Sequence, residues 1–212
     1  PQLLGEIADE FLDLLGATCS VHEVNGEYAH RASCSPWCQF LDSLAPPEGK
    51  SLCHEAHCDE VFRRAIASRE PVDVTCHSGI RVFTVAIRAG AEVVGTIAIA
   101  HGNPPQDPER LRQMAKRYGV DAEILTQRAA SFRAPSRQLI DLAKRRLISA
   151  ARLIGEIVER KRVETALAES ETRFADFMAY LPAGAFIKDE LGRLLYANRF
   201  LREMFGWEAC EG

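Results

Sequence analysis

The chain has 212 residues, of which 47% are hydrophobic and 26% are charged, a composition that suits one large or two small globular domains. Its net charge of -4 argues against direct binding of nucleic acid. No apolar run approaches the roughly 20 residues that span a bilayer, and the opening PQLLGEIADEF lacks the basic start of an export signal. We therefore expect a cytoplasmic protein with no membrane span in this chain.

The first half of the chain predicts short strands and helices joined by tight turns. Residues 3–15 form an amphipathic pattern, and Asn25-Gly26 is a strong hairpin signal between two strands. A short helix is expected after Pro36 and a second over residues 51–68. Three strands follow, the last two as a hairpin about Gly90. The turns favour an antiparallel sheet, so the expected fold class is α+β with helices flanking one sheet.

The second half predicts two capped helices and then one very long helix. Asp107 and Asp121 are the expected caps. From residue 135 to about Leu181 only Gly155 disfavours a helix, and roughly 45 helical residues would extend about 65 Å. Apolar residues follow coiled-coil spacing in two sets of different phase: first Ile140, Ala143, Leu147, Ala150, Ile154 and Ile157, then Val163, Leu167, Phe174, Phe177 and Leu181. We expect a homodimer through this helix; the alternative is a helix that packs on its own domain.

The last residues predict the beginning of another small domain. The segments AFIKD and RLLYAN read as strands and RFLREMFGW as a helix. Two strands and one helix cannot bury a core alone. The expected domains are therefore residues 1–131, a long helix over 135–181 and a partial domain over 182–212.

The cysteines crowd into the first part of the chain. Six of the seven are Cys19, Cys34, Cys38, Cys53, Cys58 and Cys76, with His54, His57 and His77 among them. Thiols at this density usually share a bridge, a metal or a redox centre, and in a reducing compartment permanent disulfides are rare. Zinc and iron–sulfur clusters both take four such ligands. The candidate ligands for zinc or an iron–sulfur cluster are Cys34, Cys38, Cys53, Cys58 and Cys76.

Three other interpretations of the thiols stay open. They could form a metal-free thiol–disulfide switch, or they could be inert, since free cysteine is among the most buried residue types. A cysteine-nucleophile enzyme would use Cys76 or Cys58 with His77 or His54 as base. We expect Cys76 and His77 to lie on a strand with their side chains on opposite faces, which disfavours that pair. The chain also lacks a phosphate loop, a dinucleotide fingerprint and a nucleophile elbow, so we expect no enzyme.

Three short elements, taken in order, resemble the PocR sensory-domain family. They are Trp37-Cys38, then Cys53, then CHSGI from Cys76 onward, followed by the strand VVGTIAIAHG. The resemblance implies a fold similar to GAF and PAS domains and a ligand such as a short alcohol, a diol or another hydrocarbon derivative. It also implies Cys38, Cys53 and Cys76 as a shared trio, to which Cys34 and Cys58 are additions. The candidate ligand-binding residues are Trp37, Phe40, His77 and Phe83.

A second resemblance covers the end of the chain. The segment ERKRVETALAESETRF resembles the signalling helix that leads into PAS domains of bacterial sensor proteins. Residues 182–212 resemble the first part of a PAS domain, mainly at Tyr196-Ala197-Asn198 and Phe205-Gly206. Together the two resemblances imply a sensory input module that binds a small molecule or a metal centre and transmits its state through a dimeric helix.

Overall fold

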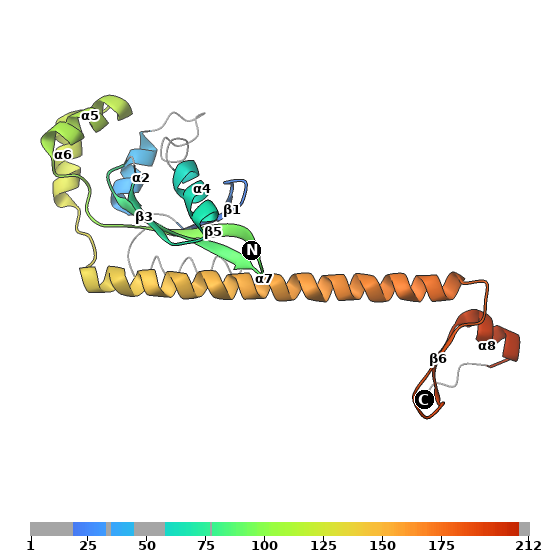
Figure 1. Cartoon of the computed structure of the whole chain (residues 1–212). Helices are drawn as coiled ribbons and strands as arrows, with labels where there is room; N and C mark the ends of the chain where they lie inside the picture. The colour runs from blue at the N-terminus through green and yellow to red at the C-terminus, as the bar shows by residue number, and fades with distance from the viewer. Residues whose placement is uncertain (1–18, 33–34, 45–57, 77, 208–212) are drawn as a thin grey trace. The chain divides into compact units, whose positions relative to one another are not determined.

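The computed structural model describes residues 19–32, 35–44, 58–76 and 78–207. In chain order the elements are β1 (Cys19–Glu23), β2 (Tyr28–Ala32), α2 (Pro36–Ser43), α4 (Cys58–Ser68), β3 (Val72–Thr75), β4 (Arg81–Ala89), β5 (Glu92–His101), α5 (Pro108–Tyr118), α6 (Ala122–Ser131), α7 (Arg137–Tyr180), β6 (Phe186–Lys188), β7 (Leu194–Ala197) and α8 (Arg199–Phe205) (Figure 1). The predicted helix over residues 3–15 and the start of that over 51–68 lie outside the described residues. The chain forms two compact units, Pro1–Glu159 and Arg160–Gly212.

The first unit is built on a five-stranded antiparallel sheet with strand order β2-β1-β5-β4-β3. Helices lie on both of its faces, so the predicted α+β fold with a flanked antiparallel sheet is confirmed. The predicted caps are also confirmed: the Asp107 carboxylate accepts from the Arg110 backbone N–H at the start of α5, and Asp121 accepts from Glu123 at the start of α6. In the described part of the chain, no helix is long and apolar enough to cross a membrane.

The two faces of this sheet differ in chemistry. One face is apolar and packs on the first part of α7; its buried members are Cys19, Val21, Phe83, Val85, Ile87, Ile97 and Ile99, and those of α7 are Ala143, Leu147, Ala151 and Ile154. The opposite face carries the buried polar side chains Ser20, His22, Thr84 and Thr96. Figure 1 shows α4 on this second side, away from α7. One sheet therefore presents an apolar surface to the long helix and a polar surface to α4.

The first part of α7 is held closely against its own sheet. A side chain at Gly155 would overlap the carbonyl oxygen of Arg88, so only glycine allows this approach of helix to strand. Ala143, Leu147 and Ile154, which the sequence placed in a coiled-coil seam, are buried here instead. That part of the seam prediction is wrong because the apolar sheet face covers these side chains, and the alternative of packing within one domain is confirmed for them.

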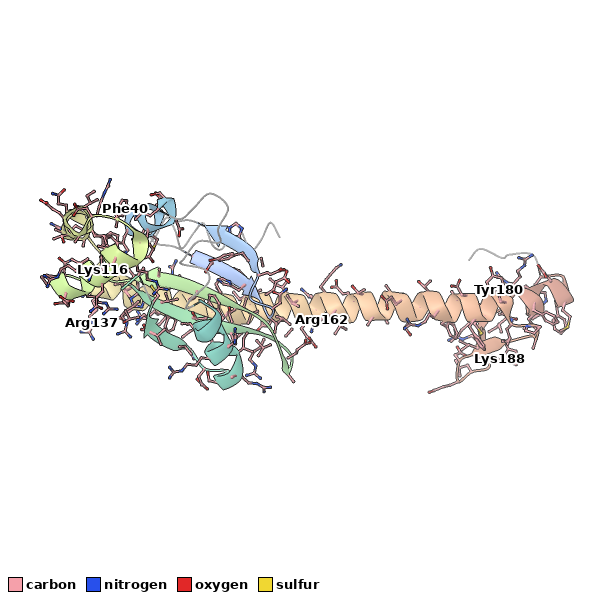
Figure 2. The ribbon with its side chains drawn as sticks, turned by 90° about the horizontal axis from the view of Figure 1, so that it is seen from above. Phe40, Lys116, Arg137, Arg162, Tyr180 and Lys188 are labelled. Carbon is pink, nitrogen blue, oxygen red and sulfur yellow. The ribbon has the colours of Figure 1, made fainter. Side chains whose placement is uncertain are left out.

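The second part of α7 leaves its large apolar side chains exposed, except for Met178 near its end, which is buried. Val163, Leu167 and Phe177 are each more than half exposed. Figure 2 shows this stretch between the labelled Arg162 and Tyr180, with side chains standing out from the helix. The homodimer through this part of the helix stays a prediction.

The second unit contains the predicted pair of strands and the helix, which are confirmed as β6, β7 and α8. A fully buried Asn198 organises it. The side-chain oxygen accepts from the backbone N–H groups of Ala185 and Leu201, at 2.9 and 3.1 Å. The side-chain nitrogen donates to the carbonyls of Met178 and Ala183, at 3.2 and 2.8 Å. One asparagine thus joins the end of α7, the following loop, the start of β6 and the start of α8.

Candidate functional site

The polar face of the sheet groups hydroxyls and an imidazole on three neighbouring strands. Ser20 of β1 and Thr84 of β4 both stand opposite Ala98 of β5. One step along the strands, Thr96 of β5 stands opposite His22 of β1. Because side chains alternate between faces, residues that pair in this register share one face. Because Ala98, between Ser20 and Thr84, has only a methyl side chain, hydroxyl groups make up most of this surface.

Two of these hydroxyls are buried and have no partner in the part of the chain that the structure describes. Thr84 and Thr96 are 0% exposed, and neither Oγ1 has a hydrogen-bond partner among the described residues. A buried hydroxyl left in this state costs about 1–3 kcal/mol, and native proteins keep few of them. Ser20 shows the usual arrangement, because its Oγ lies 3.0 Å from His22 Nε2. The two threonines are therefore groups to which an additional hydrogen-bonding molecule would be complementary.

Helix α4 covers this polar face. Its Phe62 ring lies 3.8 Å from the His22 ring, centroid to centroid, and Tyr28 contacts the same imidazole at 4.4 Å. Phe62 and Ala65 of α4 are themselves buried. His22 is thus fixed between two aromatic rings, with Ser20 as a further neighbour, and the polar surface is shielded from bulk water.

The structure brings two of the predicted cysteine ligands into one buried cluster. Cys38 of α2 and Cys76 pack in the same cluster as Trp37 and Ile80. Cys76 Sγ and Ser78 Oγ share a hydrogen bond of 2.8 Å. The prediction that Cys76 lies on a strand is wrong, because β3 ends one residue earlier and the chain turns at once. The Cys76 N–H donates to the Ile80 carbonyl, and Gly79, at φ +80°, allows the tight turn.

The other predicted ligands cannot be placed. Cys34, Cys53 and His77 lie outside the described residues, and Cys58 begins α4 without a described side chain. Among the residues that are described, no three metal-ligating side chains come together. That finding concerns only Cys38 and Cys76 of the five predicted ligands.

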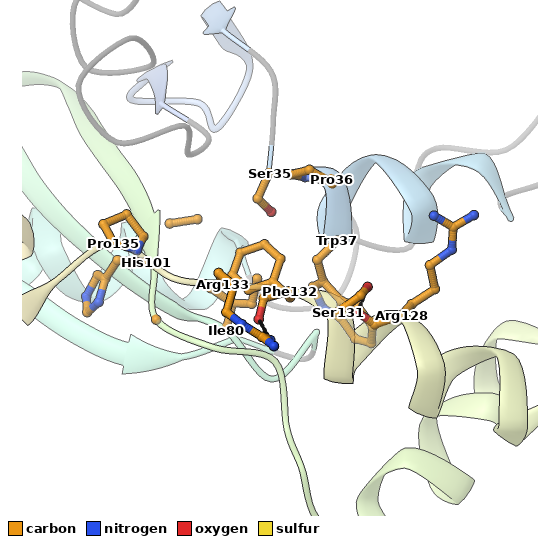
Figure 3. A pocket seen from close by; sticks show the side chains of 12 residues that line it. Ser35, Pro36, Trp37, Ile80, His101, Arg128, Ser131, Phe132, Arg133 and Pro135 are labelled. Carbon is orange, nitrogen blue, oxygen red and sulfur yellow. Dashed lines mark hydrogen bonds between the residues drawn. The ribbon is translucent and has the colours of Figure 1, made fainter.

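A pocket of about 260 Å³ lies where β5 ends (Figure 3). Trp37 and Ile80 form part of its wall, Arg128, Ser131 and Phe132 come from the end of α6 and the following residue, and Arg133, Pro135 and His101 complete its edge. Trp37 donates its indole N–H to the Ser78 carbonyl at 3.0 Å. Of the predicted ligand-binding residues, Trp37 lines this pocket.

The remaining predicted ligand-binding residues lie elsewhere. Phe40 is beside the pocket, because the Arg128 guanidinium lies 5.1 Å from the centre of its ring. Phe83 is on the apolar face of the sheet, where the Lys144 ammonium lies 5.3 Å from its ring. The structure therefore places Phe83 next to α7, separated from Trp37 and from the polar face.

A cluster of charges joins the pocket to α7. Asp73 Oδ1 lies 3.3 Å from His101 Nε2 and 2.8 Å from Arg81 Nε, while its Oδ2 lies 2.6 Å from Lys144 Nζ. Sequence reasoning missed this cluster, because its members are far apart in the chain; the one local signal is an acid inside the strand VDVT.

The charges shift the titration of two members of this cluster. Burial by itself would raise the pKa of Asp73, but hydrogen bonds from Lys144 and Arg81 outweigh it and lower the pKa below its usual value. Burial, and then the nearby Lys144 charge, lower the pKa of His101 despite the opposing effect of Asp73. At neutral pH the cluster therefore contains an ionised Asp73 and a neutral His101.

Comparison with known proteins gives one family. Residues 1–159 match the family described as the sensory domain found in PocR. No curated protein matches the chain. The Escherichia coli DhaR(N)–DhaL complex aligns at a TM-score of 0.48 and 12% identity, over 92% of this chain and 58% of that chain, so this chain spans under two thirds of it. The photoproduct state of GAF3 from Slr1393 of Synechocystis sp. PCC6803 aligns at a TM-score of 0.42 and 17% sequence identity. This alignment covers 76% of this chain and 94% of that chain. Because the family match covers well over half of the sequence, this chain belongs to the family of the sensory domain found in PocR.

Proposed function

We propose that residues 1–159 are the ligand-binding input module of a cytoplasmic bacterial signalling protein, and that the ligand binds on the polar face of the sheet. Membership of a sensory-domain family supports the input role. The single observation that carries the site is the pair of buried, unpartnered hydroxyls of Thr84 and Thr96 among the described residues. Hydroxyls both donate and accept without a formal charge, so they suit a small neutral molecule such as a short alcohol or a diol.

The spacing of the two threonines supports a ligand with more than one polar group. Thr84 stands opposite Ala98, two residues from Thr96, so the two threonines are diagonal neighbours on adjacent strands. Such neighbours are about 7–8 Å apart at the backbone. With a hydrogen bond of about 2.8 Å at each end, a molecule whose two polar atoms are separated by a few bonds could join both hydroxyls.

The same strands connect the polar face of the sheet to α7. Thr84 of β4 is flanked by Phe83 and Val85, whose side chains point to the opposite face and pack in the cluster that contains Leu147 of α7. A close-packed interior transmits small displacements rather than absorbing them. Ligand binding on the polar face would therefore change how the apolar face holds the helix, which is the kind of small shift that switches signalling proteins.

The test is a matched pair of isosteric substitutions, Thr84→Val and Thr96→Val, in the full chain. Thermal unfolding is followed with and without propane-1,2-diol, glycerol and propan-1-ol. We expect at least one compound to raise the Tm of the wild type in proportion to the logarithm of its concentration, and both variants to lose that shift. Without ligand, the variants should be as stable as the wild type or more so, because each removes an unsatisfied hydroxyl.

The control is Thr75→Val, which lies on the same sheet but is exposed. It should keep the ligand shift. The proposal fails if the buried variants are destabilised without ligand and none of the compounds shifts the Tm of the wild type. That result would mean that the threonine hydroxyls serve the fold.

A second candidate function uses the thiols. The observation that favours it is that Cys38 and Cys76 share one buried cluster. We propose that Cys34, Cys38, Cys53, Cys58 and Cys76 supply the thiolates of a zinc site or an iron–sulfur cluster, or, without a metal, a thiol–disulfide switch. Metal analysis and a visible spectrum of anaerobically purified protein test the metal centre. A colourless, metal-free and stable protein would exclude it, and mass spectrometry after mild oxidation would then test the switch.

We further propose that the chain forms a homodimer through the second part of α7 and that residues 182–212 are the first part of a PAS domain. The exposed apolar residues Val163, Leu167, Phe174 and Phe177 support the dimer. Two strands and a helix in the expected order support the PAS assignment. The dimer is tested below.

A further inference from the structure

The pocket in Figure 3 differs from the polar sheet face because two arginines line it. Arg128 and Arg133 lie in its wall beside the neutral His101, and no acidic side chain of the described residues does. Trp37, Ile80 and Phe132 provide an apolar wall. Its volume of about 260 Å³ lies just below the range of about 300–1,000 Å³ of drug-sized ligand sites, which restricts it to a small molecule. The combination suits a small molecule that has an apolar body and one anionic group.

The position of Arg133 is fixed by the backbone. Its Nη1 donates to the carbonyls of Ala130 and Phe132, at 2.6 and 2.9 Å. These bonds use one of the three guanidinium nitrogens, and an arginine held in place loses less conformational entropy when it binds a carboxylate. Arg128 stacks on Phe40 at the rim, as Figure 3 shows it extending away from the centre. Arg133 is therefore the principal cation of the pocket, and Arg128 contributes a more distant charge.

Trp37 contributes surface rather than a free donor. Its indole N–H is already bonded to the Ser78 carbonyl, and its ring is buried. The ring and Phe132 can therefore contact the apolar part of a ligand while Arg133 binds its anionic end. This division of roles between an aromatic wall and a charged group is typical of ligand pockets with few polar contacts.

We propose that this pocket is a second ligand site, for a small organic carboxylate, and that its occupancy reaches α7 through His101, Asp73 and Lys144. The site goes beyond the proposed function, because its ligand is charged and it lies apart from Thr84 and Thr96. The carboxylate binds to Arg133, and its apolar body contacts Trp37 and Phe132.

The connection to α7 follows from the shared carboxylate. His101 lines the pocket, and Asp73 contacts both His101 and Lys144. An anion in the pocket stabilises the protonated imidazole, which would then compete with Lys144 and Arg81 for Asp73. Because Lys144 belongs to α7, a weaker contact with Asp73 loosens the helix from the β3 edge of the sheet.

The binding test compares acids with their neutral amides in the full 212-residue chain. Benzoate and butyrate are titrated by calorimetry, with benzamide and butyramide as matched probes of nearly equal shape. We expect the carboxylates to bind and the amides to bind at least tenfold more weakly, because a charge-assisted hydrogen bond is about twice as strong as a neutral one. Added salt should weaken carboxylate binding.

Variants place the binding in the pocket. Arg133→Gln should weaken carboxylate binding about tenfold, and Arg128→Gln should weaken it less. Arg117→Gln, an exposed position near the end of α5, is the control and should leave binding unchanged. Lys144→Met should retain binding, but the carboxylate should no longer change hydrogen exchange in residues 140–155 of α7.

The outcomes separate this inference from the proposed function. If neither carboxylate binds, or if the amides bind equally well, the anion site is wrong, whatever the result with the diols. If Arg133→Gln binds as the wild type does, the anion is bound elsewhere and the assignment fails. If exchange in α7 responds equally in Lys144→Met, the route through Asp73 is wrong. A missing response to diols would refute only the polar-face site.

Discussion

One helix in this protein has two different environments. In residues 137–159, Ala143, Leu147 and Ile154 are buried against the apolar face of the sheet. In residues 160–180 the large apolar side chains other than Met178 are exposed, and Leu167 is 58% exposed where Leu147 is 0%. Both stretches have apolar residues at similar spacing and charged residues around them.

The difference shows that helical periodicity identifies an apolar surface but not its partner. The sheet provides the partner for the first stretch, and Gly155 allows the close approach. In the second stretch, Val163 and Leu167 remain more than half exposed among the described residues of their own unit. The first part of α7 is therefore held by its own sheet, whereas the apolar stripe of the second part is the surface of the proposed dimer.

The largest expected effect is a difference in stability between alanine substitutions in the two stretches of α7. Leu147→Ala should reduce the free energy of unfolding by about 2–5 kcal/mol, because it leaves a cavity in the buried core. Leu167→Ala should change the stability of the first unit by less than about 0.5 kcal/mol, as surface substitutions do. Chemical denaturation of both variants measures this. Equal losses would mean that the two stretches are covered alike.

A smaller effect is expected from Gly155→Ala. The added methyl group would overlap the Arg88 carbonyl, so α7 must move away from β4. Overpacking of this kind typically costs about 1–3 kcal/mol. Ala150→Gly is a useful comparison, because it should cost only about 1 kcal/mol through helix propensity. A Gly155→Ala variant that gains stability through that same propensity would contradict the close approach.

The charged contact between α7 and the sheet should matter less and should depend on pH. Lys144→Met removes the partner at 2.6 Å from Asp73 but leaves Arg81 and His101, so we expect a loss of about 1–2 kcal/mol near pH 7. The pKa of Asp73 is lower in the folded protein than the value of about 3.9 expected in the unfolded chain, so the ionised carboxylate stabilises the fold at pH values above about 3.9. This contribution is lost as the pH falls through the lowered pKa of the folded state.

Denaturation of wild type and Lys144→Met at several pH values measures this linkage. The difference in stability between the two proteins should be present at pH 6–7. It should shrink as the pH falls below about 4, where Asp73 of the unfolded chain takes up a proton, and disappear once the pH has passed the lowered pKa of the folded state. A difference that stays constant down to pH 2 would show that Lys144 acts through its packing over Phe83 rather than through its charge.

The smallest effect on the first unit, and the clearest on assembly, is expected from Phe177→Glu. Phe177 is exposed in the second part of α7, so a charge there should leave the folding of the first unit unchanged. If this stripe forms the dimer, the variant should be a monomer by analytical ultracentrifugation at concentrations where the wild type dimerises. Glu171→Gln, at a polar position of the same stretch, is the control. A wild type that stays monomeric at every concentration would contradict the dimer.

Local signals in the sequence predicted much of this structure. The caps Asp107 and Asp121, the hairpin about Gly90 and the long helix each depend on residues close together in the chain. The same signals predicted the antiparallel α+β fold. Trp37, which lines the pocket, was predicted instead from its place beside Cys38 and from the resemblance to the PocR family. Such features are determined by backbone conformation and short-range hydrogen bonds, which neighbouring residues control.

Only the tertiary structure decided which apolar face is covered and which polar groups meet. Asp73, Arg81, His101 and Lys144 come from three strands and a helix, so no spacing in the sequence could bring them together. The hydroxyls of Thr84 and Thr96, which have no hydrogen-bond partner within the described ranges, likewise become significant only when the register of β4 and β5 places them on one buried face. Burial and pairing depend on contacts between distant segments, and those contacts exist only when the sheet and its helices have come together.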